Sequence, residues 1–260
     1  MAESADSDSY GRPLLKYQIR YTVPNAFTSL SLLLGIGSIV TVQAGNLELA
    51  AWMIVWCGLL DVMDGLSARL LKATSDFGAE FDSMADLVSF GVAPAILVLN
   101  VGIEVGGIDI GSNQYWLLLV AVSVFALAGA MRLARFNLTN ETPIKGWFVG
   151  VPITATGGGL TASMALVLLK HRDIAESLPL KLYLPVLMFV LAIAMVSRIR
   201  FPKMTIWPNP VINAFQFVNV ILIYYCGITR SYPEYLFGIG LFLLVAGSIA
   251  GRMTRSSAPA

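Results

Sequence analysis

Long runs of apolar residues, separated by short polar breaks, occupy most of the chain. A helix needs about 20 mostly apolar residues to cross the hydrocarbon core of a bilayer, within a range of roughly 17–25. The polar breaks between these runs are too short to form a second globular domain. The runs predict membrane-spanning helices over residues 24–44, 47–71, 81–101, 115–137, 147–169, 181–199, 210–227 and 232–250.

The composition agrees with this pattern. Hydrophobic residues make up 57% of the chain and charged residues only 13%, whereas about a quarter of the residues in an ordinary soluble domain are charged. Together with a mean hydropathy of +0.74, this predicts an all-α, polytopic membrane helix bundle of about eight transmembrane helices. The formal net charge of +1 leaves no basic footprint for nucleic acid, so no nucleic-acid partner is expected. Cys57 and Cys226 both lie in apolar runs and are interpreted as core residues.

Three regions are expected along the chain. Residues 1–23 start with a polar, acidic stretch and then become basic and aromatic, which indicates a tail that leads into an interfacial helix. Residues 24–250 are predicted to form the transmembrane domain, and residues 251–260 a C-terminal tail.

The distribution of lysine and arginine predicts the orientation. An even number of spans places both termini on one side of the membrane. The opposite side holds only Lys170, Arg172, Lys181 and Arg230. Because basic residues are retained in cytoplasmic loops, both termini are predicted to be cytoplasmic. The basic residues on the side of the termini are Arg12, Lys16, Arg20, Arg69, Lys72, Arg132, Arg135, Lys145, Arg198, Arg200, Lys203, Arg252 and Arg255.

Four aspartates interrupt the second and third predicted spans: Asp61, Asp64, Asp82 and Asp86. A carboxylate inside a bilayer is costly, so it usually faces a cavity, a partner or a metal. Residues three or four positions apart share one face of a helix, and this spacing separates Asp61 from Asp64 and Asp82 from Asp86. A short turn joins the two helices, so they should run antiparallel with the two pairs of carboxylates opposed.

Converging carboxylates repel one another, and nearby Arg69 and Lys72 can neutralise only part of the charge. Hard divalent cations prefer oxygen ligands, and two of them would balance four negative charges. A pair of ions about 3.5–4 Å apart is a common arrangement for displacement at phosphorus. The sequence therefore predicts a divalent-metal site between the second and third spans. Mg²⁺, Mn²⁺ and Ca²⁺ share this ligand preference, so the identity of the metal stays open.

Small residues accompany the carboxylates at Gly65, Ala68 and Gly78. In membrane bundles such residues usually mark close helix packing. They also allow a bulky ligand to approach the backbone closely. Beside four aspartates and Arg69, we favour the second interpretation.

The pattern Asp61-x-x-Asp64-Gly65-x-x-Ala68-Arg69, followed after eight residues by Gly78-x-x-x-Asp82-x-x-x-Asp86, resembles the signature of the CDP-alcohol phosphotransferases at every fixed position. Further matches are Pro24-Asn25 with Thr28, Ser89-Phe-Gly91, Arg132-Leu-Ala-Arg135-Phe-Asn137 and Arg198-Ile-Arg200. These segments are most similar to those of the bacterial, membrane-embedded phosphatidylserine synthases. The segment from Ile153 to Gly159 follows the family pattern only loosely.

The resemblance implies a reaction and a set of roles. Family members transfer a phosphatidyl or similar group from a CDP-linked donor to an alcohol and release CMP. For this chain the implied substrates are CDP-diacylglycerol and L-serine. The resemblance implies that Asp61, Asp64 and Asp82 bind two divalent ions, and that Asp86 is the catalytic base and also contacts a metal. The residues implied to border the donor are Asn25, Thr28, Gly65, Ala68, Arg69, Ser75 and Gly78.

The acceptor pocket is less well defined by the sequence. Arg132 and Arg135 lie three residues apart at the cytoplasmic end of the fourth span, and an arginine fork suits a carboxylate such as that of serine. Arginines at this position also satisfy the positive-inside rule alone. The family resemblance favours a role in acceptor binding. Glycerol 3-phosphate or an inositol phosphate remains an alternative acceptor.

A cation-coupled transporter is the alternative from another class, because transporters also carry aspartates within the membrane. The aspartates here cluster on one consecutive helix pair, and no inverted repeat is apparent. Asp61 lies about 14 residues from the outer end of its predicted helix, or roughly 21 Å at 1.5 Å per residue. In a hydrocarbon core of about 30 Å, this places the site in the cytoplasmic half of the membrane, and the resemblance implies a bacterial-type inner membrane. The resemblance also implies a homodimer.

Overall fold

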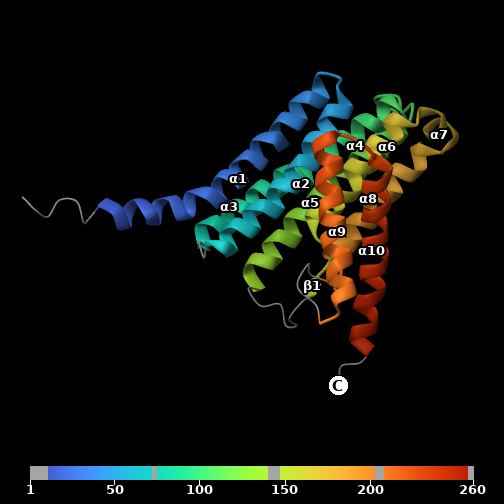
Figure 1. Ribbon diagram of the computed structural model, residues 1–260. Coiled ribbons are helices and arrows are strands. Elements are labelled where there is room, and N and C mark those ends of the chain that lie inside the picture. The colour runs from blue at the N-terminus through green and yellow to red at the C-terminus, as the bar shows by residue number, and fades with distance from the viewer. Residues whose placement is uncertain (1–10, 72–74, 140–146, 203–207, 257–260) are drawn as a thin grey trace, which may run out of the picture.

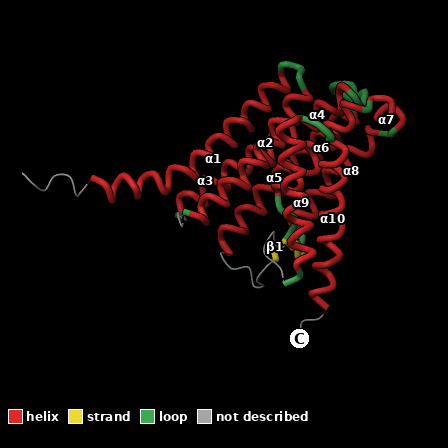
Figure 2. The backbone as a smooth tube through the Cα atoms, viewed as in Figure 1, coloured by secondary structure: helices red, strands yellow, loops and turns green. Residues whose placement is uncertain are grey.

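Helices make up nearly all of the computed structural model, which describes residues 11–71, 75–139, 147–202 and 208–256 (Figures 1 and 2). Two π-helical segments, η1 and η2, and two short strands complete the described elements. In chain order these are α1 (Gly11–Gln43), α2 (Leu47–Leu70), α3 (Asp76–Asp86), η1 (Leu87–Val92), α4 (Ala93–Glu104), α5 (Asn113–Thr139), β1 (Trp147–Val149), η2 (Thr154–Thr161), α6 (Ala162–Lys170), α7 (Arg172–Ser177), α8 (Leu180–Val196), β2 (Arg200–Pro202), α9 (Pro210–Thr229) and α10 (Pro233–Ser256).

Six helical stretches of the described chain are long and apolar enough to span a bilayer. The polytopic membrane helix bundle is therefore confirmed at this level. The two remaining predicted spans correspond to shorter elements: α8 has 17 residues, and η2 leads directly into α6. The six stretches are Thr22–Gln43, Leu47–Leu70, Asp76–Glu104, Asn113–Leu138, Pro210–Thr229 and Pro233–Gly251.

Two predicted boundaries were wrong. Helix α1 runs without a break from Gly11 through Pro24, and its apolar part, Thr22–Gln43, agrees with the predicted span 24–44. The predicted span 147–169 opens with strand β1, because Trp147–Val149 pairs with the distant strand β2 before the chain becomes helical. The third span begins at Asp76, so Glu80, which precedes the predicted span 81–101, lies in α3.

The third span changes its helical type just after Asp86. Helix α3 is followed without a break by η1 and then by α4, so one continuous helix extends from Asp76 to Glu104. A π-helical turn inserts an additional residue into the helical repeat and is often found at functional sites. The residues beyond it consequently face different neighbours than an uninterrupted α-helix would present.

Small residues allow the two π-helical segments to meet. A Cβ atom added at Gly157 of η2 would lie 2.0 Å from the carbonyl oxygen of Phe90 in η1, and one at Gly158 would lie 2.9 Å from the Phe90 ring. A run of small residues such as Gly157-Gly158-Gly159 can serve packing within one bundle or contact with a second copy. Gly157 and Gly158 serve packing within the bundle.

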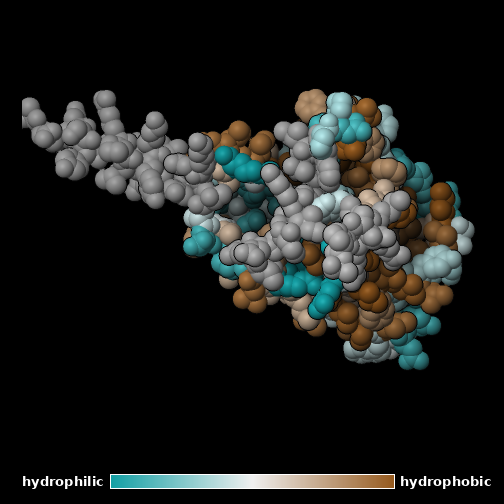
Figure 3. All heavy atoms as spheres, turned by 90° about the horizontal axis from the view of Figure 1, so that it is seen from below, coloured by the Kyte–Doolittle hydropathy of each residue, from teal (hydrophilic) through white to brown (hydrophobic). Residues whose placement is uncertain are grey.

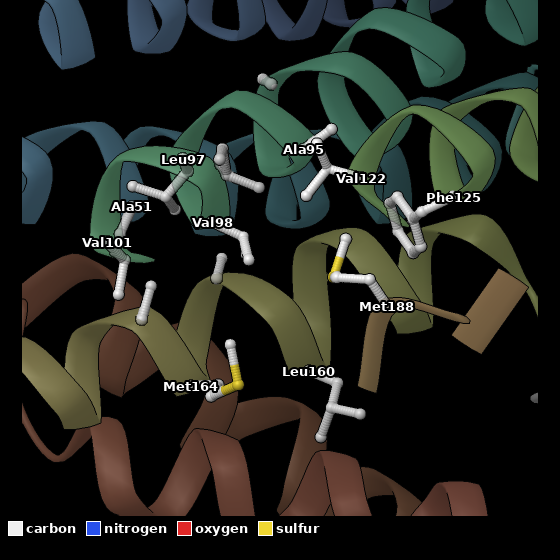
Figure 4. Close-up of a cluster of buried hydrophobic side chains, with 14 of the residues drawn as sticks. Ala51, Ala95, Leu97, Val98, Val101, Val122, Phe125, Leu160, Met164 and Met188 are labelled. Atoms are coloured by element: carbon white, nitrogen blue, oxygen red, sulfur yellow. The ribbon is translucent and has the colours of Figure 1, made fainter. Parts of the chain in front are cut away.

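The core lies between the central helices. Figure 4 shows its buried side chains, which come from α2, α4, α5, η2, α6 and α8. The outer faces of α9 and α10 expose large apolar residues, as expected for helices surrounded by lipid. The residues labelled in Figure 4 are Ala51, Ala95, Leu97, Val98, Val101, Val122, Phe125, Leu160, Met164 and Met188.

Candidate active site

Helices α2 and α3 bring carboxylates together at the end of the bundle where α3 lies beside α1 (Figure 1). Asp61, Asp64 and Asp82 can each offer one oxygen atom such that all three lie within 4.8 Å of one another. The spacing of these residues on two antiparallel helices predicts this convergence. Seen from below, hydrophilic patches lie at the left of the bundle, below its centre and along its right edge, and hydrophobic residues cover much of the lower right (Figure 3).

The donor set fits a hard divalent cation. Carboxylate oxygens are the ligands that Mg²⁺, Mn²⁺ and Ca²⁺ prefer, and three of them within this distance would repel one another without a compensating charge. Asp64 is 7% exposed, so little water is available to screen it. Asp61, Asp64 and Asp82 are therefore the residues that could hold a metal.

Asp86 stands apart from this group of three. Its charge interacts with those of Asp61, Asp64 and Asp82, and also with Arg132 of α5. It lies in the last turn of α3, directly before η1. Its position, close to the metal-binding group yet outside it, suits a proton acceptor; its additional role as a metal ligand stays a prediction.

Two threonines lie beside the aspartates of α2. The hydroxyl of Thr28 in α1 donates a hydrogen bond of 2.9 Å to Asp64 Oδ2, and Thr154 of η2 lies near Asp61. Sequence reasoning missed Thr154, because the segment around it matched the family pattern only loosely. The only available signal was that Thr154 carries a hydroxyl and lies in a predicted span that could pack beside the span of Asp61.

The residues predicted to border the donor lie on three adjoining elements. Ser75 caps α3 by accepting a hydrogen bond of 3.0 Å from the backbone N–H of Gly78. An added Cβ at Gly78 would also lie 3.3 Å from Asn25 Oδ1 of α1. Since a helix N-terminus attracts negative charge, this corner of the site is compatible with a diphosphate.

The remaining residues predicted to border the CDP-linked donor lie on α2, beyond Asp64. The Arg69 guanidinium folds back along the helix and donates 3.0 Å to the Gly65 carbonyl oxygen. Ala68 is half-buried, whereas Arg69 is exposed. The Arg69 guanidinium therefore lies on the exposed surface of α2, one turn beyond Gly65.

The two arginines of α5 have different surroundings. Arg132 is 7% exposed and interacts electrostatically with Asp86. Arg135 donates to the carbonyl oxygens of Val196 at 2.9 Å and Val149 at 3.2 Å. The structure thus brings Arg132 to the aspartates and uses Arg135 to join α5 to the end of α8 and to β1. The predicted contact of Arg135 with an acceptor stays a prediction.

A model of the CDP-alcohol phosphatidyltransferase family matches residues 21–245. The chain belongs to that family. The family resemblance inferred from the aspartate signature is confirmed. As a CDP-alcohol phosphatidyltransferase, the chain is an enzyme and an integral membrane protein, and the cation-coupled transporter is rejected.

Curated relatives of this CDP-alcohol phosphatidyltransferase share one name, CDP-diacylglycerol–serine O-phosphatidyltransferase. The protein of Helicobacter pylori is 33% identical over 86% of this chain and 89% of its own length. That of Methanocaldococcus jannaschii is 31% identical over 88% of this chain and 93% of its own length. That of Bacillus subtilis is 32% identical over 69% of this chain and 89% of its own length.

Proposed function

We propose that this enzyme transfers a phosphatidyl group from CDP-diacylglycerol to the hydroxyl of L-serine, giving phosphatidylserine and CMP. The observation that carries the proposal is the convergence of Asp61, Asp64 and Asp82 with Asp86 and Arg132 beside them. The names of the relatives supply the substrates.

Asp86 acts as the general base. It accepts the proton of the serine hydroxyl while that oxygen attacks the phosphorus that carries the diacylglycerol group. The bond from this phosphorus to the CMP oxygen breaks, and CMP leaves with the bonding electron pair. A reaction of this type demands in-line positioning and charge stabilisation more than covalent work by the protein.

Two divalent ions, Mg²⁺ or Mn²⁺ with Ca²⁺ as a further candidate, are proposed at Asp61, Asp64 and Asp82. The chemistry supplied by bound ions is neutralisation of the carboxylates and stabilisation of the charge on the departing CMP. Thr28 orients the carboxylate of Asp64 through its hydroxyl group, and Thr154 lies near Asp61. The donor diphosphate is bordered by Asn25, Thr28, Gly65, Ala68, Arg69, Ser75 and Gly78.

Arg132 is the proposed partner of the serine carboxylate. Arg132 is buried, and its charge interacts with that of Asp86. One acceptor molecule can therefore place its hydroxyl at the base and its carboxylate at the arginine. A planar guanidinium matches a carboxylate with two parallel hydrogen bonds. A phosphorylated acceptor would require more positive charge at the same position.

The membrane arrangement is part of the proposal. We infer eight spans, with η2–α6 and α8 as the two short ones, both termini in the cytoplasm, and an active site open to the cytoplasmic side of a bacterial inner membrane. The distribution of lysine and arginine supports this orientation. The enzyme is further proposed to be a homodimer, which light scattering of the purified protein in detergent would test.

A comparison of acceptor alcohols tests the proposed reaction. Purified protein in detergent is given CDP-diacylglycerol, Mn²⁺ or Mg²⁺, and one alcohol at a time. We expect CMP release with L-serine, and none above background with glycerol 3-phosphate or inositol phosphate. CMP release with a phosphorylated acceptor but not with serine would overturn the acceptor assignment while leaving the reaction class intact.

A further inference from the structure

A hydrogen-bonded contact joins α3 to α5 outside the carboxylate group. The side-chain amide nitrogen of Asn137 in α5 donates to Glu80 Oε2 at 3.0 Å and to Ser83 Oγ at 3.1 Å, both in α3. We refer to Glu80, Ser83 and Asn137 as the α3–α5 clamp. None of these three residues belongs to the metal-binding group.

The hydrogen bonds of the clamp use the full donor capacity of the amide. An asparagine amide nitrogen carries two protons, and one is directed to Glu80 and one to Ser83. The Ser83 hydroxyl lies 3.0 Å from the Ala79 carbonyl oxygen and 3.1 Å from Asn137 Oδ1, and can donate to either. Since both amide protons of Asn137 are already engaged within the protein, they are not available to a substrate carboxylate.

The position of the clamp relates it to the chemistry. Ser83 directly follows Asp82 and precedes Asp86 by less than one turn. On the partner helix, Asn137 follows Arg132 by about one and a half turns. Asp86 and Arg132 are near enough for their charges to interact. The two helices therefore run antiparallel, and the hydrogen-bonded clamp lies next to the facing pair Asp86 and Arg132.

Helix α3 approaches α5 closely at few points. It packs mainly against α1 and continues into η1, which itself packs against α5. The clamp supplies the side-chain contact between α3 and α5 at Glu80 and Ser83, in the middle of α3.

We propose that Asn137 is a positioning residue: through Glu80 and Ser83 it sets the separation between Asp86 and Arg132, and thereby the width of the acceptor pocket. The inference rests on the proposed function, in which the acceptor lies between these two side chains. It predicts that losing the clamp weakens acceptor binding more than it affects donor binding or turnover at saturation.

Exchanging donor and acceptor across the clamp provides the test. Asn137→Asp removes both N–H donors and places a second carboxylate against Glu80. Loss of a hydrogen bond to a charged group, with the added repulsion, should raise the KM for serine by about tenfold or more. We expect kcat and the KM for CDP-diacylglycerol to change by less than about threefold, because Asp61, Asp64 and Asp82 keep their places.

Two further variants separate positioning from direct contact. Glu80→Gln keeps an acceptor oxygen for Asn137, so its KM for serine should stay within about threefold of wild type. In the double variant Asn137→Asp/Glu80→Gln, the new glutamine amide can donate to the new aspartate carboxylate. The clamp is thereby rebuilt with its polarity reversed, and the KM for serine should return to within about threefold of wild type.

Three results would overturn the inference. The KM for serine could remain unchanged in Asn137→Asp, the double variant could remain as impaired as Asn137→Asp, or kcat could fall with the KM unaltered. A monodisperse size-exclusion profile of each variant establishes that it is folded. If the wild type used a different acceptor, the proposed function would have failed, and the same variants assayed with that acceptor would still decide the role of the clamp.

Discussion

The hydroxyl of Thr28 in α1 lies 2.9 Å from a carboxylate oxygen of Asp64 in α2, and both side chains are buried. The same hydroxyl is 3.2 Å from the Pro24 carbonyl oxygen, but a hydrogen bond to a carboxylate is the stronger of the two. The sequence predicted that Thr28 borders the CDP-linked donor substrate. Its geometry adds a second role, which is to fix the orientation of a metal-binding carboxylate.

Thr28→Val tests this orientation. Valine keeps the branched shape and removes the hydroxyl, so Asp64 loses its partner. Partners of this kind typically contribute 10–100-fold to metal affinity or activity, and we expect the Mn²⁺ concentration for half-maximal activity to rise by about tenfold. Thr28→Ser is the matched control and should remain close to wild type. An unchanged Mn²⁺ requirement in Thr28→Val would show that the hydrogen bond has no such role.

Asp86→Asn tests the general base. The asparagine cannot accept the serine proton, whereas Asp61, Asp64 and Asp82 are retained for donor binding. We expect turnover to fall by about 10²–10⁴-fold, while CDP-diacylglycerol binding, measured by equilibrium titration of the detergent-solubilised protein, remains measurable. Near-normal turnover would show that another group takes the proton.

Gly157→Ala tests the close contact between the π-helical segments. The added methyl would lie 2.0 Å from the Phe90 carbonyl oxygen, so η1 and η2 would have to separate. Overpacking of this kind usually costs about 1–3 kcal/mol, and the melting temperature in detergent should fall. Gly159→Ala is the matched control in the same run, because its nearest contact would be 3.9 Å away. Equal melting temperatures for the two variants would contradict the packing.

Arg135→Lys separates two roles of this arginine. Lysine keeps the charge but cannot reach the carbonyl oxygens of Val149 and Val196 together. Losing about 1 kcal/mol of hydrogen bonding should lower the melting temperature by about 2–4 °C. Exposed Arg172→Lys on α7 serves as the control. If the melting temperature were unchanged and the KM for serine rose, Arg135 would act on the acceptor and not on the architecture.

The sequence predicted the central geometry because carboxylate spacing is a local property. Asp61 and Asp64 share a helix face by their separation alone, and a short connection forces the next helix to run antiparallel. The apolar runs similarly predicted the long helices. These features depend on residues that are near one another in the chain.

The missed features depend on contacts between distant segments. Strand β1 forms because residues 147–149 meet residues 200–202, and nothing in either triplet alone predicts this pairing. The π-helical segment after Asp86 packs closely against η2, which lies far away in the chain. The clamp joins Glu80 to Asn137 across 57 positions, and Glu80 precedes the predicted span 81–101. Such pairings require the three-dimensional structure.

The central claim is that carboxylates from α2 and α3 bind divalent cations in one site. Titration of the purified protein with Mn²⁺, with free Mn²⁺ measured by electron paramagnetic resonance, tests it most directly. We predict saturable binding by the wild type and by the control Asp173→Asn in α7, and affinity weakened by about tenfold or more in Asp61→Asn, with donor binding weakened in parallel. Mn²⁺ binding of equal affinity in Asp61→Asn and wild type would contradict the account.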